Sequence, residues 1–205
     1  MKKAILFLLA ASISLQIFAQ TQAETYVNEA LEFLKNKEYK QAQLSLQDAI
    51  NEINVLLAQQ VAESLPAEIN GLKADGDSEV STAGMGMIGG GLQVIKRYAN
   101  ESKPANNAEV QILANSPMVA TISMYLSNPG MMGPDYKSVR IGTNRAILKL
   151  EMMDDGSTKS RSTEIQLVLS QTLITIRTNG FATEQEELAF ANKLDFNKIR
   201  TALGE

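Results

Sequence analysis

Gly84–Gly89 is the first candidate for a functional site, because it contains the nucleotide-binding pattern G-x-G-x-x-G. In a dinucleotide-binding site this pattern follows a strand and opens a helix, whose N-terminal amides bind the pyrophosphate. Here Asp75–Glu79 is typical of a polar turn, and Leu92–Tyr98 has the β-branched and aromatic residues of a strand. Because the required helix is missing, the glycines are interpreted as a bulged or flexible entry into a strand.

Methionine is the second candidate, because soft thioether ligands select Cu(I). The chain has nine methionines but no histidine or cysteine to accompany them, and flexible methionine is ordinary core filler. We therefore interpret the methionines, including the adjacent pair Met152-Met153, as packing residues and predict no metal or cofactor. The alternative is a carrier of Cu(I) or of a small apolar ligand, which would use Met85, Met87, Met131 and Met132.

The absent residue types restrict catalysis. Without histidine or cysteine, triads built on either residue and ordinary zinc sites are excluded. The adjacent carboxylates Asp154 and Asp155 suit a turn, and the acidic residues of Asp75–Glu79 lack the twelve-residue pattern of a calcium loop. No catalytic residue is predicted, and the chain is not expected to be an enzyme.

The first 19 residues have the pattern of a secretory signal peptide. Lys2 and Lys3 precede the apolar run Ala4–Ala11, and a plausible cleavage site follows at Ala19. Without residues 1–19 the chain keeps 17 basic and 23 acidic residues, a net charge of −6, which disfavours nucleic acid as a partner. No later run is apolar enough to span a membrane. We expect a periplasmic or secreted protein.

Residues 20–64 are expected to form an antiparallel helical hairpin. Val27, Ala30, Leu31 and Leu34 form one apolar helical stripe, and a second helix ends near Ser64. One tetratricopeptide-like unit also fits this segment, but a solenoid needs about three stacked repeats and no second copy is found. The positions that match that unit are Ala30, Tyr39, Ala42, Leu46, Ala49 and Ile50.

A connector at residues 65–79 separates this hairpin from an α+β domain at residues 80–205. Strands are predicted at Leu92–Tyr98, Val110–Ala114, Val139–Ile141, Ala146–Leu150, Ile165–Leu169 and Leu173–Arg177. One helix is predicted at Met118–Leu126. A second follows a Thr183 capping box and has Leu188, Ala191 and Leu194 on one face, with Phe190 alongside, and a short third helix follows an Asp195 cap. The predicted fold is a mainly antiparallel sheet covered by helices.

Four segments carry a resemblance to an uncharacterised family of exported bacterial proteins: LPAEINGLKA, AGMGMIGGGLQVIKRY, ANSPMVATISMYLSNPGMM and VRIGTNRAIL. The similarity spans about Leu65 to Asp195, although Leu72 stands where that family often has an aromatic residue. In layout the chain resembles PsbP-like domains. The resemblance implies an antiparallel sheet flanked by helices and supplies no activity.

Together these features predict an exported, non-catalytic binding protein of the bacterial cell envelope. Its expected partner is another envelope protein, which would bind through the helical hairpin or the Gly/Met segment.

Overall fold

The fold is α+β, with a large antiparallel sheet. The computed structural model describes residues 22–83, 91–115, 118–128, 133–154 and 159–205. The chain divides into two compact units, residues 1–59 and residues 60–205. None of the described helices combines the length and the hydropathy of a membrane-spanning segment.

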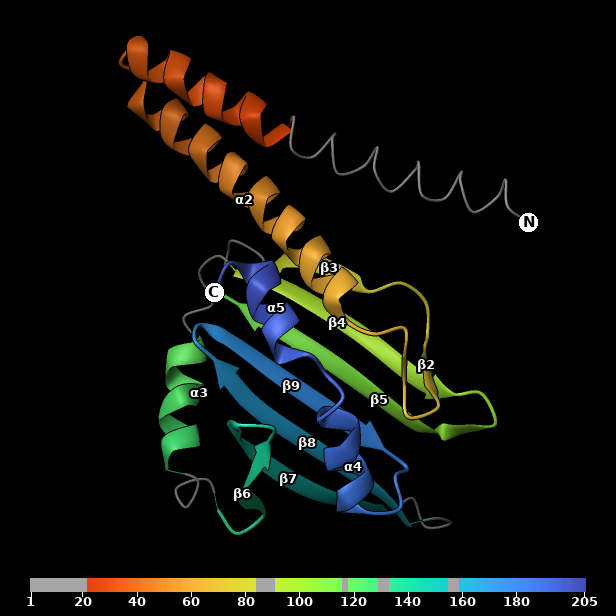
Figure 1. The fold of residues 1–205 in the computed structure, drawn as a ribbon. Helices are drawn as coiled ribbons and strands as arrows, with labels where there is room; N and C mark the ends of the chain where they lie inside the picture. The colour runs from red at the N-terminus through yellow and green to blue at the C-terminus, as the bar shows by residue number, and fades with distance from the viewer. Residues whose placement is uncertain (1–21, 84–90, 116–117, 129–132, 155–158) are drawn as a thin grey trace, which may run out of the picture. The chain divides into compact units, whose positions relative to one another are not determined.

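Nine described strands form one sheet in the second unit (Figure 1). The order across the sheet is β1-β2-β4-β5-β9-β8-β7-β6, and β3 also pairs with β4. The described strand pairs are all antiparallel, and most of the paired strands are neighbours in sequence. The strands are β1 (Glu68–Ile69), β2 (Leu72–Ala74), β3 (Glu79–Ala83), β4 (Gly91–Asn100), β5 (Lys103–Ala114), β6 (Tyr136–Ile141), β7 (Asn144–Asp154), β8 (Lys159–Leu169) and β9 (Thr172–Asn179).

The six strands predicted from sequence are all present, because their apolar residues alternate with the period of a strand. The register places Val94, Ile112 and Ile174 side by side, so these residues share one face of the sheet. We call this the core face. Its side chains are almost completely buried, including Leu92, Val94, Tyr98, Val110, Ile112, Ile165, Leu167, Ile174 and Ile176.

Helix α4 (Glu184–Ala191) covers part of the core face. The ring of Phe190 meets the ring of Tyr98 edge-on, with 5.6 Å between the centroids. Burial raises the pKa of the Tyr98 hydroxyl well above its ordinary value, and this hydroxyl donates to the Pro66 carbonyl at 2.9 Å. A neutral, hydrogen-bonded tyrosine is therefore part of the core.

The predicted N-caps Thr183 and Asp195 are confirmed, whereas the Glu186 carboxylate bonds the residue before Thr183 instead of the Thr183 amide that a capping box uses. The Thr183 hydroxyl accepts from the Glu186 amide at 3.3 Å, and the Glu186 carboxylate accepts from the amide of Ala182 at 3.1 Å. The Asp195 carboxylate accepts from the amides of Asn197 and Lys198 at the start of α5 (Phe196–Leu203). These bonds satisfy amides that a helix start leaves unpaired.

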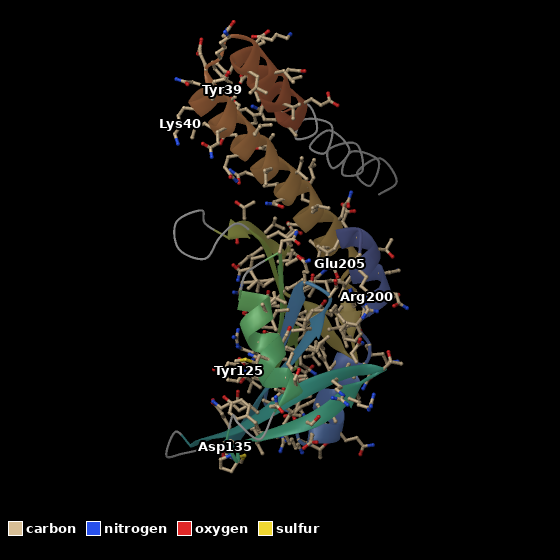
Figure 2. The ribbon with its side chains drawn as sticks, turned by 90° about the vertical axis from the view of Figure 1, so that its left-hand side faces the viewer. Tyr39, Lys40, Tyr125, Asp135, Arg200 and Glu205 are labelled. Carbon is tan, nitrogen blue, oxygen red and sulfur yellow. The ribbon has the colours of Figure 1, made fainter. Side chains whose placement is uncertain are left out.

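Helix α3 (Met118–Ser127) contacts β7, β8 and β9, and it lies on the opposite side of the sheet from α4 and α5 (Figure 2). This second face of the sheet is apolar at one end, where Leu173 and Ile147 are buried. Toward the other end its residues are charged and polar. Only part of the second face is therefore an apolar core.

The predicted buried face is confirmed at Phe190, Ala191 and Leu194, and it differs at one position of α4. Leu188 is only half-buried, whereas Glu187 is fully buried together with Phe190 and Ala191. The Glu187 carboxylate accepts two bonds from the Arg161 guanidinium, at 2.7 and 3.0 Å. A buried carboxylate that is paired in this way can occupy a core position that hydropathy assigns to leucine.

Thr178 contributes the one buried side-chain oxygen without a hydrogen-bond partner among the described residues. It lies beside Thr163, whose hydroxyl donates to Glu187 at 2.7 Å. Thr178→Val should stabilise the protein by about 1 kcal/mol in urea unfolding, because valine keeps the shape and removes an unpaired hydroxyl. Thr163→Val should destabilise it. Destabilisation by Thr178→Val would show that this hydroxyl has a partner in solution.

Residues 65–79, expected to be a connector, carry a β-hairpin. Strands β1 and β2 are joined by Asn70-Gly71, and both residues have positive φ, at 51° and 82°. Two positive φ values define the type I′ turn, for which Asn-Gly is the preferred dipeptide. The Asn-Gly dipeptide indicates this turn in the sequence. The strands on either side of it are only two and three residues long, too short to show a strand periodicity.

In the first unit, residues 22–35 are helical, and α2 (Tyr39–Ser64) follows after Asn36, Lys37 and Glu38. Lys37 has φ 61°. Its amide donates to Leu34 O at 3.1 Å, and the Glu38 amide donates to Phe33 O at 2.8 Å. These two bonds form a Schellman motif, which ends the first helix.

Candidate binding surfaces

The methionines of the Cu(I) alternative, Met85, Met87, Met131 and Met132, lie outside the described residues, as does Gly84–Gly89. Their neighbours are described. Strand β3 precedes the glycine segment and β4 follows it, with Ala83 paired to Gly91. The segment therefore connects two antiparallel strands, and a strand follows where a dinucleotide motif requires a helix.

Two further observations bear on metal binding. Within the described residues, no three His, Cys, Asp or Glu side chains come together as a metal site. Met152 does not pack as predicted, since 61% of its surface is exposed. It lies on β7, and its partner on β8 is Arg161.

Exposed apolar side chains are concentrated in residues 27–53. Figure 2 labels Tyr39 and Lys40 at the start of α2, in this region. We use the term apolar surface for Val27, Leu31, Leu34, Leu46, Ile50 and Ile53, each of which is 39–50% exposed. In contrast, the small residues Ala30, Ala42, Ser45 and Ala49 of the same two helices are buried. Apolar groups clustered in this way commonly mark an interaction site.

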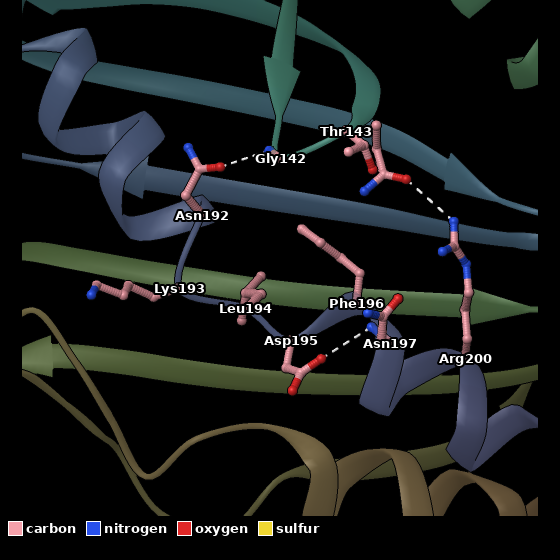
Figure 3. A pocket seen from close by; sticks show the side chains of 10 residues that line it. Gly142, Thr143, Asn192, Lys193, Leu194, Asp195, Phe196, Asn197 and Arg200 are labelled. Carbon is pink, nitrogen blue, oxygen red and sulfur yellow. Dashed lines mark hydrogen bonds between the residues drawn. The ribbon is translucent and has the colours of Figure 1, made fainter.

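A first cleft, of about 470 Å³, lies between the β6–β7 turn and the connection from α4 to α5 (Figure 3). Its polar groups already bond to one another. The Asn192 side chain accepts from the Gly142 amide at 2.7 Å, and the Asn144 side chain accepts from Arg200 at 3.2 Å. These contacts hold the turn against the helices and indicate a structural role.

A second cavity, of about 330 Å³, lies among β6, β7, β8 and β9. We call it the polar cavity. Most of its side chains come from the second face of the sheet, because Tyr136 pairs with Lys149, Lys149 with Glu164, and Glu164 with Arg177. Glu151, Ser162 and Asn179 also line it. The cavity is thus assembled by strand register from four separate segments of sequence.

The charges of the polar cavity are balanced in pairs. Lys149 forms an ion pair with Glu151, and Arg177 Nε donates to Glu164 at 2.8 Å. Arg177 Nη1 also donates to Glu109 at 3.1 Å, outside the cavity lining. Burial lowers the pKa of Arg177, but its bonds to Glu164 and Glu109 outweigh this effect and raise the pKa overall. The bond to Glu151 likewise raises the pKa of Lys149. Both cations stay charged at neutral pH.

The polar cavity has no recognisable pattern in the sequence. No pair of its charged residues has a local spacing that indicates a site, since Lys149 and Arg177 are 28 positions apart and meet only through the sheet register. Comparison of the sequence with models of known protein families finds no match, and a search of curated proteins also finds no match.

Proposed function

We propose that this protein is an exported, non-catalytic binding protein of the bacterial cell envelope, and that it binds another protein through the apolar surface of residues 27–53. The main support for the proposal is that large apolar side chains of these helices are exposed to solvent. Ile50, Leu31 and Ile53 are 50%, 50% and 46% exposed, whereas alanines of the same helices are buried.

The proposal includes an antiparallel pairing of residues 22–35 with α2. Three residues separate the two helices, and the left-handed Lys37 allows the chain to reverse direction there. Buried Ala30, Ala42 and Ala49 would allow close approach of the two helix backbones. Such a pairing uses the small residues and leaves the larger apolar residues free for a partner.

The exposed apolar side chains of residues 27–53 can stabilise a complex with a partner. Leu46, Ile50 and Ile53 follow the 4-3 spacing with which a helix presents one stripe to another helix. Burying a side chain of this size stabilises a complex by about 1.5–3 kcal/mol before the costs of association are subtracted. Several such residues together are enough to support specific binding.

The proposal that the protein is exported is based on residues 1–19, which have the signal-peptide pattern.

Site-specific photo-crosslinking in intact cells tests the proposal. A photoreactive residue at Ile50 or Leu31 should give crosslinked products with another protein. The same residue at Gln41, an exposed polar position of α2, serves as the matched control. Equal crosslinking at Ile50 and Gln41, or none at Ile50 and Leu31, would contradict binding through the apolar surface.

A further inference from the structure

We infer that the polar cavity binds an uncharged, polyhydroxylated ligand of the size of one or two sugar units. This inference concerns the sheet of the second unit and does not depend on the function proposed for residues 27–53. It is based on three observations: the charge balance of the cavity, its unused hydrogen-bonding groups, and its volume.

The charge balance disfavours a charged ligand. Lys149 is paired with Glu151, and Arg177 is paired with Glu164, so the lining presents two cations and two carboxylates. An anion would have to compete with these carboxylates for the cations, and it would also be repelled by them. A zwitterion would have to separate both ion pairs. A neutral ligand can bind while both pairs remain intact.

Several groups in the lining retain hydrogen-bonding capacity. Within the described part of the chain, no side-chain bond is made by Arg177 Nη2 or by the hydroxyls of Tyr136 and Ser162. The side-chain nitrogen of Asn179, which also lines the cavity, donates to Asn107 at 3.0 Å, and no described residue donates to its side-chain oxygen. The lining therefore offers both donors and acceptors, and sugar hydroxyls, which both donate and accept, match such a set.

The size and the aromatic lining fit the same class of ligand. A volume of about 330 Å³ is at the lower end of the range for small-molecule sites. The half-buried ring of Tyr136 adds a flat apolar surface on which the C–H groups of a sugar can pack. Lys149 Nζ lies 5.7 Å from the centroid of this ring, within the range of a cation–π contact.

The test is a titration of the full mature protein, followed by amide NMR, with three neutral disaccharides: cellobiose, maltose and N,N′-diacetylchitobiose. At least one should shift amide signals of β7, β8 and β9, with a Kd of about 1 mM or below. Tyr136→Phe combined with Ser162→Ala keeps the ring and both ion pairs, and should weaken this binding about tenfold. Ser81→Ala, on the same face of the sheet but outside the cavity, should leave the binding unchanged.

Glycine and acetate, as zwitterionic and anionic probes, should not shift these signals at the same concentrations. The inference is overturned if none of the three disaccharides binds. It is also overturned if the double variant and Ser81→Ala bind equally well, or if glycine or acetate binds the cavity as tightly as the best disaccharide. The NMR spectra of the variants without ligand show whether each remains folded.

Discussion

Gly180→Ala is expected to destabilise the protein by about 3–5 kcal/mol, the range reached when strain and steric overlap combine. Gly180 follows β9 with φ 70°, a region that costs an L-residue about 1–2 kcal/mol. A Cβ atom there would lie 2.3 Å from the carbonyl oxygen of Ala105 and 2.8 Å from its carbonyl carbon. Both atoms belong to backbone within β5, so relief would require movement of a central strand.

Hydrogen bonds fix Gly180 in this position. Its amide donates to Arg161 O at 3.0 Å, and its carbonyl accepts from the Asn106 side chain at 3.2 Å. A shift that relieved the overlap with Ala105 would therefore disturb β5 and β8 together. The measurement is urea unfolding followed by circular dichroism, with the free energy of unfolding extrapolated to water.

Gly142→Ala is the matched control for this prediction. Gly142 also has positive φ, at 58°, but a Cβ atom there would meet nothing within 4 Å. It should therefore cost only the backbone strain, about 1–2 kcal/mol. If the two substitutions destabilised the protein equally, the close approach of β5 to Gly180 would not exist in solution.

The sequence predicts those parts of the fold that depend on local patterns. Alternating residues such as Ile165, Leu167 and Leu169 locate the central strands, and Thr183 and Asp195 mark the starts of the last helices. A short strand has no such periodicity. Strands β1 and β2 escaped prediction for this reason, although Asn70-Gly71 marks the turn between them, and the five-residue strand β3 was not predicted either.

The two candidate sites differ in the same respect, because one depends on a local pattern and the other on contacts between strands. The exposed stripe that includes Leu46, Ile50 and Ile53 lies on a single helix, so helical periodicity finds it, although periodicity does not tell whether it is covered. The polar cavity depends on contacts between strands, because Arg177 meets Glu164 only when β8 and β9 pair in this register. Such a site cannot be inferred from residue spacing along one segment.

Glu187→Ala is the second substitution with a large expected effect, a destabilisation of about 3 kcal/mol in urea unfolding. The Glu187 side chain is fully buried, and its loss leaves Arg161 without its main partner and Thr163 without an acceptor. Removing one member of a buried ion pair typically costs about 3–5 kcal/mol. The lower end applies because the Arg161 side chain keeps 19% exposure and can be partly hydrated.

Glu184→Ala, in the same helix, is the control. Glu184 pairs with Lys137 and lies 3.8 Å from Arg161, but its side chain is 31% exposed, so the loss should be about 1 kcal/mol or less. In high salt the effect of Glu184→Ala should shrink, whereas that of Glu187→Ala should persist because a buried pair is screened much less. Similar losses for both variants would contradict the burial of Glu187.

Removing both charges of the buried pair separates the cost of an unpaired charge from the value of the pair. Arg161→Met with Glu187→Leu replaces the pair by apolar side chains of similar length, so no buried charge remains without a partner. We expect this double variant to recover most of the stability lost in Glu187→Ala, because buried ion pairs often contribute little net stability relative to well-packed apolar residues. A double variant as unstable as Glu187→Ala would instead show that the bonds among Glu187, Arg161 and Thr163 hold α4 on β8.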